Sequence, residues 1–271
     1  MRHSLIIGVV VAGLLACSEP AIQSTPASVS STSLSTPVAT TSPSQATTTT
    51  TASPMQVLVF HKTAGFRHDS IPAGIEAINA LGEEHGFVVT ATDDASVFTE
   101  SGLADYEVVV FLSTTGDILD PTQEQAMKNF IQSGNGFVGI HSATDTEYEW
   151  PWYGDLVGAY FDGHPAPQPA TVHVVEPDHP TMQGLPVESE LFDEWYNFRN
   201  APGAEVTVLA ALDETTYEGG TMGGNHPITW AQEFDGGRSF YTARGHPLES
   251  YSEPTFRTLL GNAIRWAAGV D

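Results

Sequence analysis

Three histidines each follow a compact apolar run that is typical of a buried strand. They are His68, His141 and His246. In open α/β sheets, ligands bind where the carboxyl ends of the strands meet, so we expect these side chains to gather at one edge of a sheet. Imidazoles in such a place can bind a divalent metal or act as general acid and base. Their spacing matches no single metal motif such as HExxH, so both interpretations stay open.

Two residues from the middle of the chain join this set. His164 lies in a Gly-His-Pro sequence, and Glu194 lies in the run DEWY at 193–196. A structural role competes with a chemical one here, because the residue before proline is pushed towards extended conformations and His-Pro pairs often mark turns. For that reason His179 and His226, which also precede prolines, are weak candidates for a site.

The elements that would position these residues alternate between two patterns. Continuous apolar runs predict strands at 56–60, 87–90, 107–112, 136–140, 206–212, 228–234 and 238–243. Apolar residues at helical spacing predict helices at 71–85, 121–133 and from 254 to the end. Strands buried on both faces and alternating with helices predict an α/β fold with a mainly parallel central sheet.

Local signals place the ends of several elements. Ser70 is expected to cap the first helix, and Asp120 starts a capping box for the second. The sequence Asp-Gly-Gly at 235–237 predicts a hairpin turn. Ser142 and Asp145 also fit a capping box, and this would make both of them local structure instead of parts of a site.

The first part of the chain carries export signals. A short apolar run after a basic start predicts a signal peptide at 1–16, too short to span a bilayer stably. The sequence Leu-Leu-Ala before Cys17 resembles a bacterial lipobox, which predicts an acylated cysteine and a membrane-anchored, exported lipoprotein, on the outer-membrane or periplasmic face or the cell surface. Residues 17–54 are rich in Ser, Thr and Pro and are predicted to be a disordered tether. One folded domain then covers 55–271.

Charge and cysteine content exclude some classes of protein. The chain has a formal net charge of −24, from 33 acidic and 9 basic residues. Such a surface repels phosphate backbones, so nucleic acid is not expected as a partner. Because Cys17 is the only cysteine, no internal disulfide can form.

Seven ordered motifs make the chain similar to a known family. They are GFRHDSI, GNGFVGIHSATDT, GAYFDGHP, DHPTMQGLP, DEWY, HPITWAQEF and GRSFYTARGHPLESY. In this order they resemble the ThuA-like family, named for trehalose utilisation, across about residues 55–269. The resemblance implies a flavodoxin-like fold of the class I glutamine amidotransferase type and an association with the breakdown of disaccharides or keto sugars.

The resemblance also bears on the site. In amidotransferases of this fold, the turn after the fourth predicted strand carries the nucleophilic cysteine, whereas this chain has His141 there. A thioester mechanism is therefore excluded, and Ser142 is displaced by one residue from the position that an amidase would need. The motif positions expected to line the site are His68, His141, His164, Glu194 and His246.

Two functions follow as hypotheses. The first is a hydrolase or lyase that acts on a disaccharide or its 3-keto derivative, with His141, Glu194 and His68 as catalytic acid and base groups. Zinc or another transition metal, held by His68, His141, His164 and His246, would assist. The alternative is a non-catalytic carbohydrate-binding lipoprotein, which needs no histidine cluster.

Both functions require a surface that binds a sugar. The residues expected to contact it are Phe66, Arg67, Trp152, Trp195 and Tyr196. Aromatic rings offer flat apolar faces to sugar rings, but ordinary packing in the core is the competing role for each of them. Elemental analysis and turnover of a 3-keto disaccharide would separate the enzyme from the binding protein.

Overall fold

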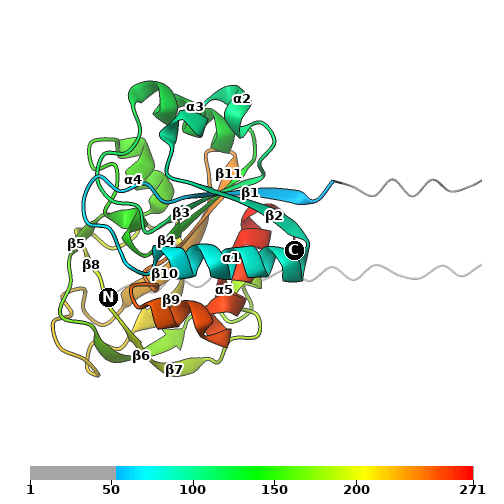
Figure 1. Ribbon diagram of the computed structural model, residues 1–271. Helices are drawn as coiled ribbons and strands as arrows, with labels where there is room; N and C mark the ends of the chain where they lie inside the picture. Colours follow the sequence, from blue (N-terminus) through cyan, green and yellow to red (C-terminus); the bar gives the residue numbers. More distant parts are fainter. Residues whose placement is uncertain (1–52, 271) are drawn as a thin grey trace, which may run out of the picture. The chain divides into compact units, whose positions relative to one another are not determined.

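The structure is a computed structural model that describes residues 53–270 (Figure 1). The predicted signal peptide at 1–16, the lipidation site Cys17 and nearly all of the predicted tether lie outside the described residues. Within residues 53–270, no helix combines the length and the apolar character needed to cross a membrane.

Within the described residues, nine strands form one sheet in the order β2-β1-β3-β4-β11-β10-β9-β6-β7. From β2 to β11 the neighbours are parallel, and from β11 to β7 each neighbour is antiparallel. The strands are β1 (Met55–Phe60), β2 (Phe87–Thr92), β3 (Val108–Leu112), β4 (Gly136–Ile140), β6 (Gln168–Val174), β7 (Glu188–Asp193), β9 (Thr207–Leu212), β10 (His226–Phe234) and β11 (Gly237–Thr242). The predicted α/β fold with a mainly parallel sheet is confirmed, and the second half of the chain adds an antiparallel extension.

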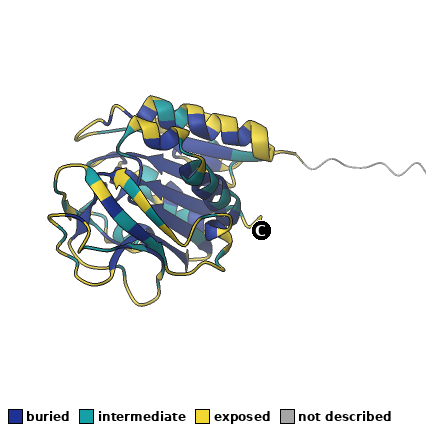
Figure 2. Cartoon of the chain, turned by 90° about the horizontal axis from the view of Figure 1, so that it is seen from below, coloured by how far each residue is buried: buried dark blue, intermediate teal, exposed yellow. Residues whose placement is uncertain are grey.

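Helices cover the parallel half of the sheet on both faces. Figure 1 shows α1 and α5 on one side of the strands, with α2, α3 and α4 on the other. The helices are α1 (Ile71–His85), α2 (Glu100–Leu103), α3 (Pro121–Gln132), α4 (Pro151–Val157) and α5 (Pro254–Ala267). A small separate ladder pairs β5 (Phe161–Gly163) with β8 (Asn197–Phe198). Figure 2 shows the central strands of the sheet as the buried layer, whereas the outer surfaces of the helices and parts of the edge strands are exposed.

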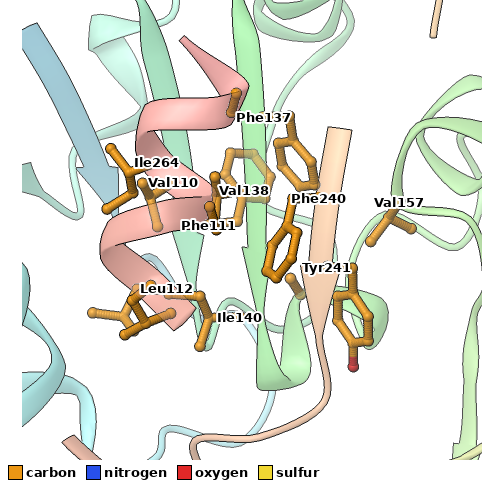
Figure 3. Close-up of a cluster of buried hydrophobic side chains, with 14 of the residues drawn as sticks. Val110, Phe111, Leu112, Phe137, Val138, Ile140, Val157, Phe240, Tyr241 and Ile264 are labelled. Atoms are coloured by element: carbon orange, nitrogen blue, oxygen red, sulfur yellow. The ribbon is translucent and has the colours of Figure 1, made fainter. Parts of the chain in front are cut away.

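The core explains why the central strands are apolar at every position. All residues of β3 and β4 are buried, because each face of these strands packs against helices. On the α4 face, the ring of Phe137 lies 5.3 Å from that of Phe111 and 5.9 Å from that of Tyr153. Figure 3 shows Ile264 of α5 and Val157 of α4 among the side chains that pack against these strands.

The predicted local signals were partly right. Asp120 forms its capping box, since its carboxylate accepts the backbone N–H groups of Thr122 and Gln123 at 2.8 and 3.0 Å. The hairpin turn is also confirmed, with positive φ angles at Asp235 and Gly236. The predicted cap at Ser70 is wrong, because its hydroxyl donates to the carbonyl of Gly245 instead, at 3.0 Å.

The topology brings distant segments to one edge of the sheet. The carboxyl ends of β1, β4 and β11 share this edge because these strands are parallel. From β11 onward the strand direction reverses at each of the next four strands, β10, β9, β6 and β7. After four reversals, β7 runs in the same direction as β11. The carboxyl end of β7, at Asp193, therefore lies at the same edge as the end of β11.

Candidate functional site

His141 is the first residue beyond β4, and its backbone is strained. Its φ is +53°, in the left-handed region that residues other than glycine rarely adopt. The side chain is fully buried, and its Nδ1 lies 2.9 Å from the carbonyl oxygen of Ala243. A carbonyl only accepts, so Nδ1 carries the hydrogen and Nε2 of the neutral ring presents a lone pair to the interior of the site.

His68 meets His141 across this space. The two Nε2 atoms are 3.1 Å apart, and the rings are nearly perpendicular. The other nitrogen of His68, Nδ1, lies 3.4 Å from the hydroxyl of Ser142. The alternative that Ser142 and Asp145 form a capping box is wrong, because no side chain caps this turn and Asp145 accepts a hydrogen bond from Tyr148 at 2.7 Å.

Glu194 connects the other histidines. Its Oε2 lies 3.1 Å from Nδ1 of His246 and 3.6 Å from Nε2 of His141. Its second oxygen, Oε1, lies 3.1 Å from Nδ1 of His164. One buried carboxylate thus faces three imidazoles that come from separate segments of the chain.

Four of these side chains form a group that could hold a metal ion. Ligand atoms of His68, His141, Glu194 and His246, which we call the four-residue cluster, all lie within 4.8 Å of one another. Ligands bound to tetrahedral zinc at 2.0–2.1 Å are about 3.3 Å apart. Three contacts in the cluster, at 3.1, 3.1 and 3.6 Å, are near that spacing, and the wider separations stay within 4.8 Å. Imidazole with carboxylate suits zinc and other divalent transition metals.

The predicted metal ligands need one correction. His164 does not belong to the four-residue cluster, and Glu194, expected as an acid or base, takes its place. His164 instead stands at the rim with 38% of its side chain exposed. Its Nδ1 lies near two acceptors, Glu194 and the carbonyl of Pro165 at 2.9 Å, so Nδ1 donates and Nε2 of the neutral ring is free.

The charges of the cluster are set by burial and by hydrogen bonds. Burial, together with the neighbouring histidines, lowers the pKa of His68 to about 3, so this ring is neutral. Burial alone would raise the pKa of Glu194, but the neighbouring imidazoles of His141 and His246 outweigh it and hold the pKa below its usual value. The carboxylate of Glu194, 3.1 Å from Nδ1, raises the pKa of His246. Neutral imidazole nitrogens beside an ionised carboxylate are the forms that bind a metal.

Tyr196 contributes a hydroxyl instead of the aromatic face that the sequence predicts. Its OH lies 3.1 Å from Nε2 of His141, and the ring is buried between His141 and Phe161. Burial raises the pKa of Tyr196, so the phenol stays protonated and can donate. This role could not be read from the sequence, where Tyr196 is one of several aromatic residues.

The other four residues predicted to contact a sugar differ in their exposure and in their distance from the cluster. Phe66 is 66% exposed, and its ring lies 4.8 Å from that of His68 at the mouth of the site. Arg67 is exposed, with a guanidinium nitrogen 3.5 Å from the carbonyl of His61. The predictions for Trp195 and Trp152 are contradicted.

Trp195 is fully buried, and its indole N–H donates to the carbonyl of Gln168 at 2.8 Å. It therefore offers no face to a ligand. Trp152 donates to Asp235 at 2.8 Å. Asp235 follows the carboxyl end of β10, whereas the amino end of β10 lies at the edge of the site, so Trp152 is at the opposite end of the sheet.

Comparisons with known proteins agree with this architecture. The family model of ThuA, described as trehalose utilisation, matches residues 56–267. A ThuA-like protein from Bacteroides uniformis is 25% identical, with a TM-score of 0.68, over 79% of this chain and 92% of the other. A ThuA-like protein from Parabacteroides merdae is 20% identical, with a TM-score of 0.67, over 79% and 90%.

A likeness in fold alone extends further. A β-galactosidase from Bacillus circulans sp. alkalophilus is 13% identical, with a TM-score of 0.53, over 81% of this chain and 32% of that enzyme. No curated protein matches the chain.

Proposed function

The chain belongs to the ThuA family, and from this premise we propose that it is a metal-dependent enzyme that cleaves disaccharides or their 3-keto derivatives. The observation that supports the proposal best is the convergence of three imidazoles and one carboxylate at a single edge of the sheet. Four segments that are distant in sequence supply these groups. If the side chains served only to pack the core, their ligand atoms would not need to face one another.

The residues divide the chemistry between them. His68, His141, Glu194 and His246 would hold a divalent metal, which supplies Lewis-acid polarisation of a sugar oxygen when bound. His164 is placed to accept a proton, because its free Nε2 is at the exposed rim. Tyr196 keeps its proton and can donate a hydrogen bond inside the site.

For a 3-keto sugar the proposed reaction is an elimination. The ketone acidifies the neighbouring C–H bond, and the base takes that proton. The electron pair of the C–H bond becomes a C=C bond while the bond to the glycosidic oxygen breaks. The leaving oxygen then takes up one proton, so the overall reaction needs no oxidant or reductant.

The location also belongs to this proposal. The lipobox-like sequence before Cys17 and the tether 17–54 support an exported lipoprotein anchored in a membrane, with a carbohydrate as its substrate. Labelling with palmitate, lost in a Cys17→Ser variant, tests the anchor without reference to the enzyme activity.

One experiment tests the enzyme. The purified protein is analysed for bound metals and assayed with 3-keto-trehalose before and after chelation. We expect about one equivalent of zinc or another transition metal, turnover that chelation abolishes, and loss of both in His141→Ala. His173→Ala is the matched control, because His173 lies on β6 with 43% of its side chain exposed. Equal turnover by the wild type and His141→Ala would exclude the proposed site.

A carbohydrate-binding protein is the second candidate. The exposed Phe66 beside the cluster favours it, since an exposed ring can stack on a sugar without any catalysis. Calorimetry separates the two functions. Tight sugar binding without product, unchanged by chelation and by His141→Ala, would support the binding protein.

A further inference from the structure

Asp193 lies at the end of β7, directly before Glu194, and carries a fully buried carboxylate. Burying an ionised carboxylate is unfavourable unless donors surround it. Its oxygens accept four hydrogen bonds, from the backbone N–H groups of Glu194 at 2.9 Å, His246 at 3.1 Å and Gly245 at 3.0 Å, and from the hydroxyl of Ser250 at 3.5 Å. The buried group thus joins two segments that are distant in sequence.

These two segments carry two of the four ligands in the cluster. Glu194 follows β7, and His246 lies in the loop after β11. The hydrogen bonds to Asp193 hold the backbones of both residues, and their side chains meet at 3.1 Å between Oε2 and Nδ1. One carboxylate therefore connects the backbones that carry these two ligand side chains.

The loop after β11 is constrained at Gly245. Gly245 has a φ of +120°, and a Cβ at this position would lie 2.8 Å from the hydroxyl of Tyr251. The carbonyl of Gly245 also accepts the hydrogen bond from Ser70. The carboxylate of Asp193 accepts the backbone N–H groups of Gly245 and His246 in the same loop. Replacing one of its carboxylate oxygens would therefore shift His246.

We infer that Asp193 is a positioning residue that sets the metal affinity of the cluster through the loop of His246, an inference that rests on the proposed metal site. Partners that orient metal ligands typically change metal affinity by 10–100-fold when they are removed. Asp193 is not itself a ligand, since both of its oxygens are used by backbone and hydroxyl donors.

The test is a cobalt titration of the full chain. In Asp193→Asn, one acceptor oxygen becomes an NH₂ donor of the same size. The amide oxygen can still accept from Glu194 and His246, but the NH₂ would face the N–H of Gly245. We expect the Co²⁺ Kd to rise about 10–100-fold, with a changed d–d absorption spectrum.

A double-mutant cycle tests whether Asp193 acts on cobalt binding through His246. In a His246→Ala background, Asp193→Asn should weaken cobalt binding much less than in the wild type, because the residue on which it acts is gone. An equal effect in both backgrounds would overturn the inference, as would wild-type affinity in Asp193→Asn. If the wild type itself binds no cobalt, the proposed metal site fails together with this inference.

A second variant covers the case in which Asp193→Asn does not fold. Gly245→Ala keeps Asp193 intact and displaces the loop from its other side, by the contact with Tyr251. It too should weaken cobalt binding and change the spectrum. Thermal unfolding in chelator checks that each variant is folded, and unchanged affinity in a folded Gly245→Ala would show that the position of the loop does not set the affinity.

Discussion

The carbonyl oxygen of Ala243 lies 2.9 Å from Nδ1 of His141 and orients the ring whose other nitrogen faces the centre of the cluster. Two strands meet at this contact, because His141 follows β4 and Ala243 follows β11, its parallel neighbour. The hydrogen bond selects the tautomer in which Nε2 is unprotonated. A histidine that binds a metal commonly donates its other N–H in this way.

Metal binding should stabilise the folded protein. A ligand that binds only the folded state at a free concentration 100 times its Kd adds about 2.7 kcal/mol, which corresponds to a rise in Tm of about 5–10 °C for a domain of this size. We expect this rise when zinc is added to chelator-treated protein, measured by calorimetry. The rise should disappear in His68→Ala and persist in His173→Ala. A rise of the same size in His68→Ala would place the metal elsewhere.

His164 should matter for catalysis and not for metal content. It lies outside the four-residue cluster, and its Nδ1 contacts the Glu194 oxygen that faces away from the other histidines. Loss of a general base typically lowers the rate by 10²–10⁴-fold. We therefore expect His164→Ala to lower kcat for 3-keto-trehalose by about this factor while the protein retains its bound metal. Loss of the metal in this variant would make His164 a ligand, as the sequence predicted.

The sequence predicts much of this structure because the relevant signals are local. Continuous apolar runs at Val108–Leu112 and Gly136–Ile140 indicate strands buried on both faces, and the structure confirms them. Once the strands are parallel, residues after their carboxyl ends must share an edge. This reasoning alone brings His68, His141 and His246 together.

The remaining features depend on contacts between distant segments. Nothing in the run DEWY shows that Trp195 points into the core while Glu194 joins the cluster. The direction of β7 follows from four antiparallel pairings, of which the β10–β11 hairpin alone has a signature in the sequence. Asp193 acquires three of its four donors from the segment after β11. The sequence predicts a sugar contact for Trp152 because the residue is aromatic, but α4 carries it to the far end of the sheet.

Two aromatic residues from the same predicted surface should behave oppositely. Phe66→Ala removes a ring that is 66% exposed at the mouth of the site, so we expect a higher KM for the sugar and a change in unfolding free energy within about 0.5 kcal/mol. Trp195→Ala removes a fully buried ring and should destabilise the fold by about 3–5 kcal/mol. Denaturant unfolding and steady-state kinetics measure both. A strongly destabilised Phe66→Ala would contradict its placement.

The last prediction concerns pH and a helix cap far from the cluster. Nδ1 of His179 accepts the N–H of Thr181 at 3.3 Å and lies 2.8 Å from its hydroxyl, at the start of a short 3₁₀ helix. Burial, more than the nearby charge of Arg238, lowers the pKa of His179 from 6.5, against the opposing charge of Glu176. A protonated ring cannot accept, so this cap is fully present above pH 6.5 and is lost as the pH falls below that value towards the lowered pKa.

Caps of this kind contribute about 1 kcal/mol. We therefore expect His179→Asn, which supplies an acceptor that does not titrate, to lose less unfolding free energy than the wild type between pH 7.5 and pH 5. Denaturant unfolding at the two pH values measures the difference, which should be about 1 kcal/mol or less because His179 is only partly buried. The His173→Ala variant should follow the wild type, since that ring is half-exposed on β6 and caps no helix. Identical pH dependence in the wild type and His179→Asn would show that the cap does not depend on the protonation of His179.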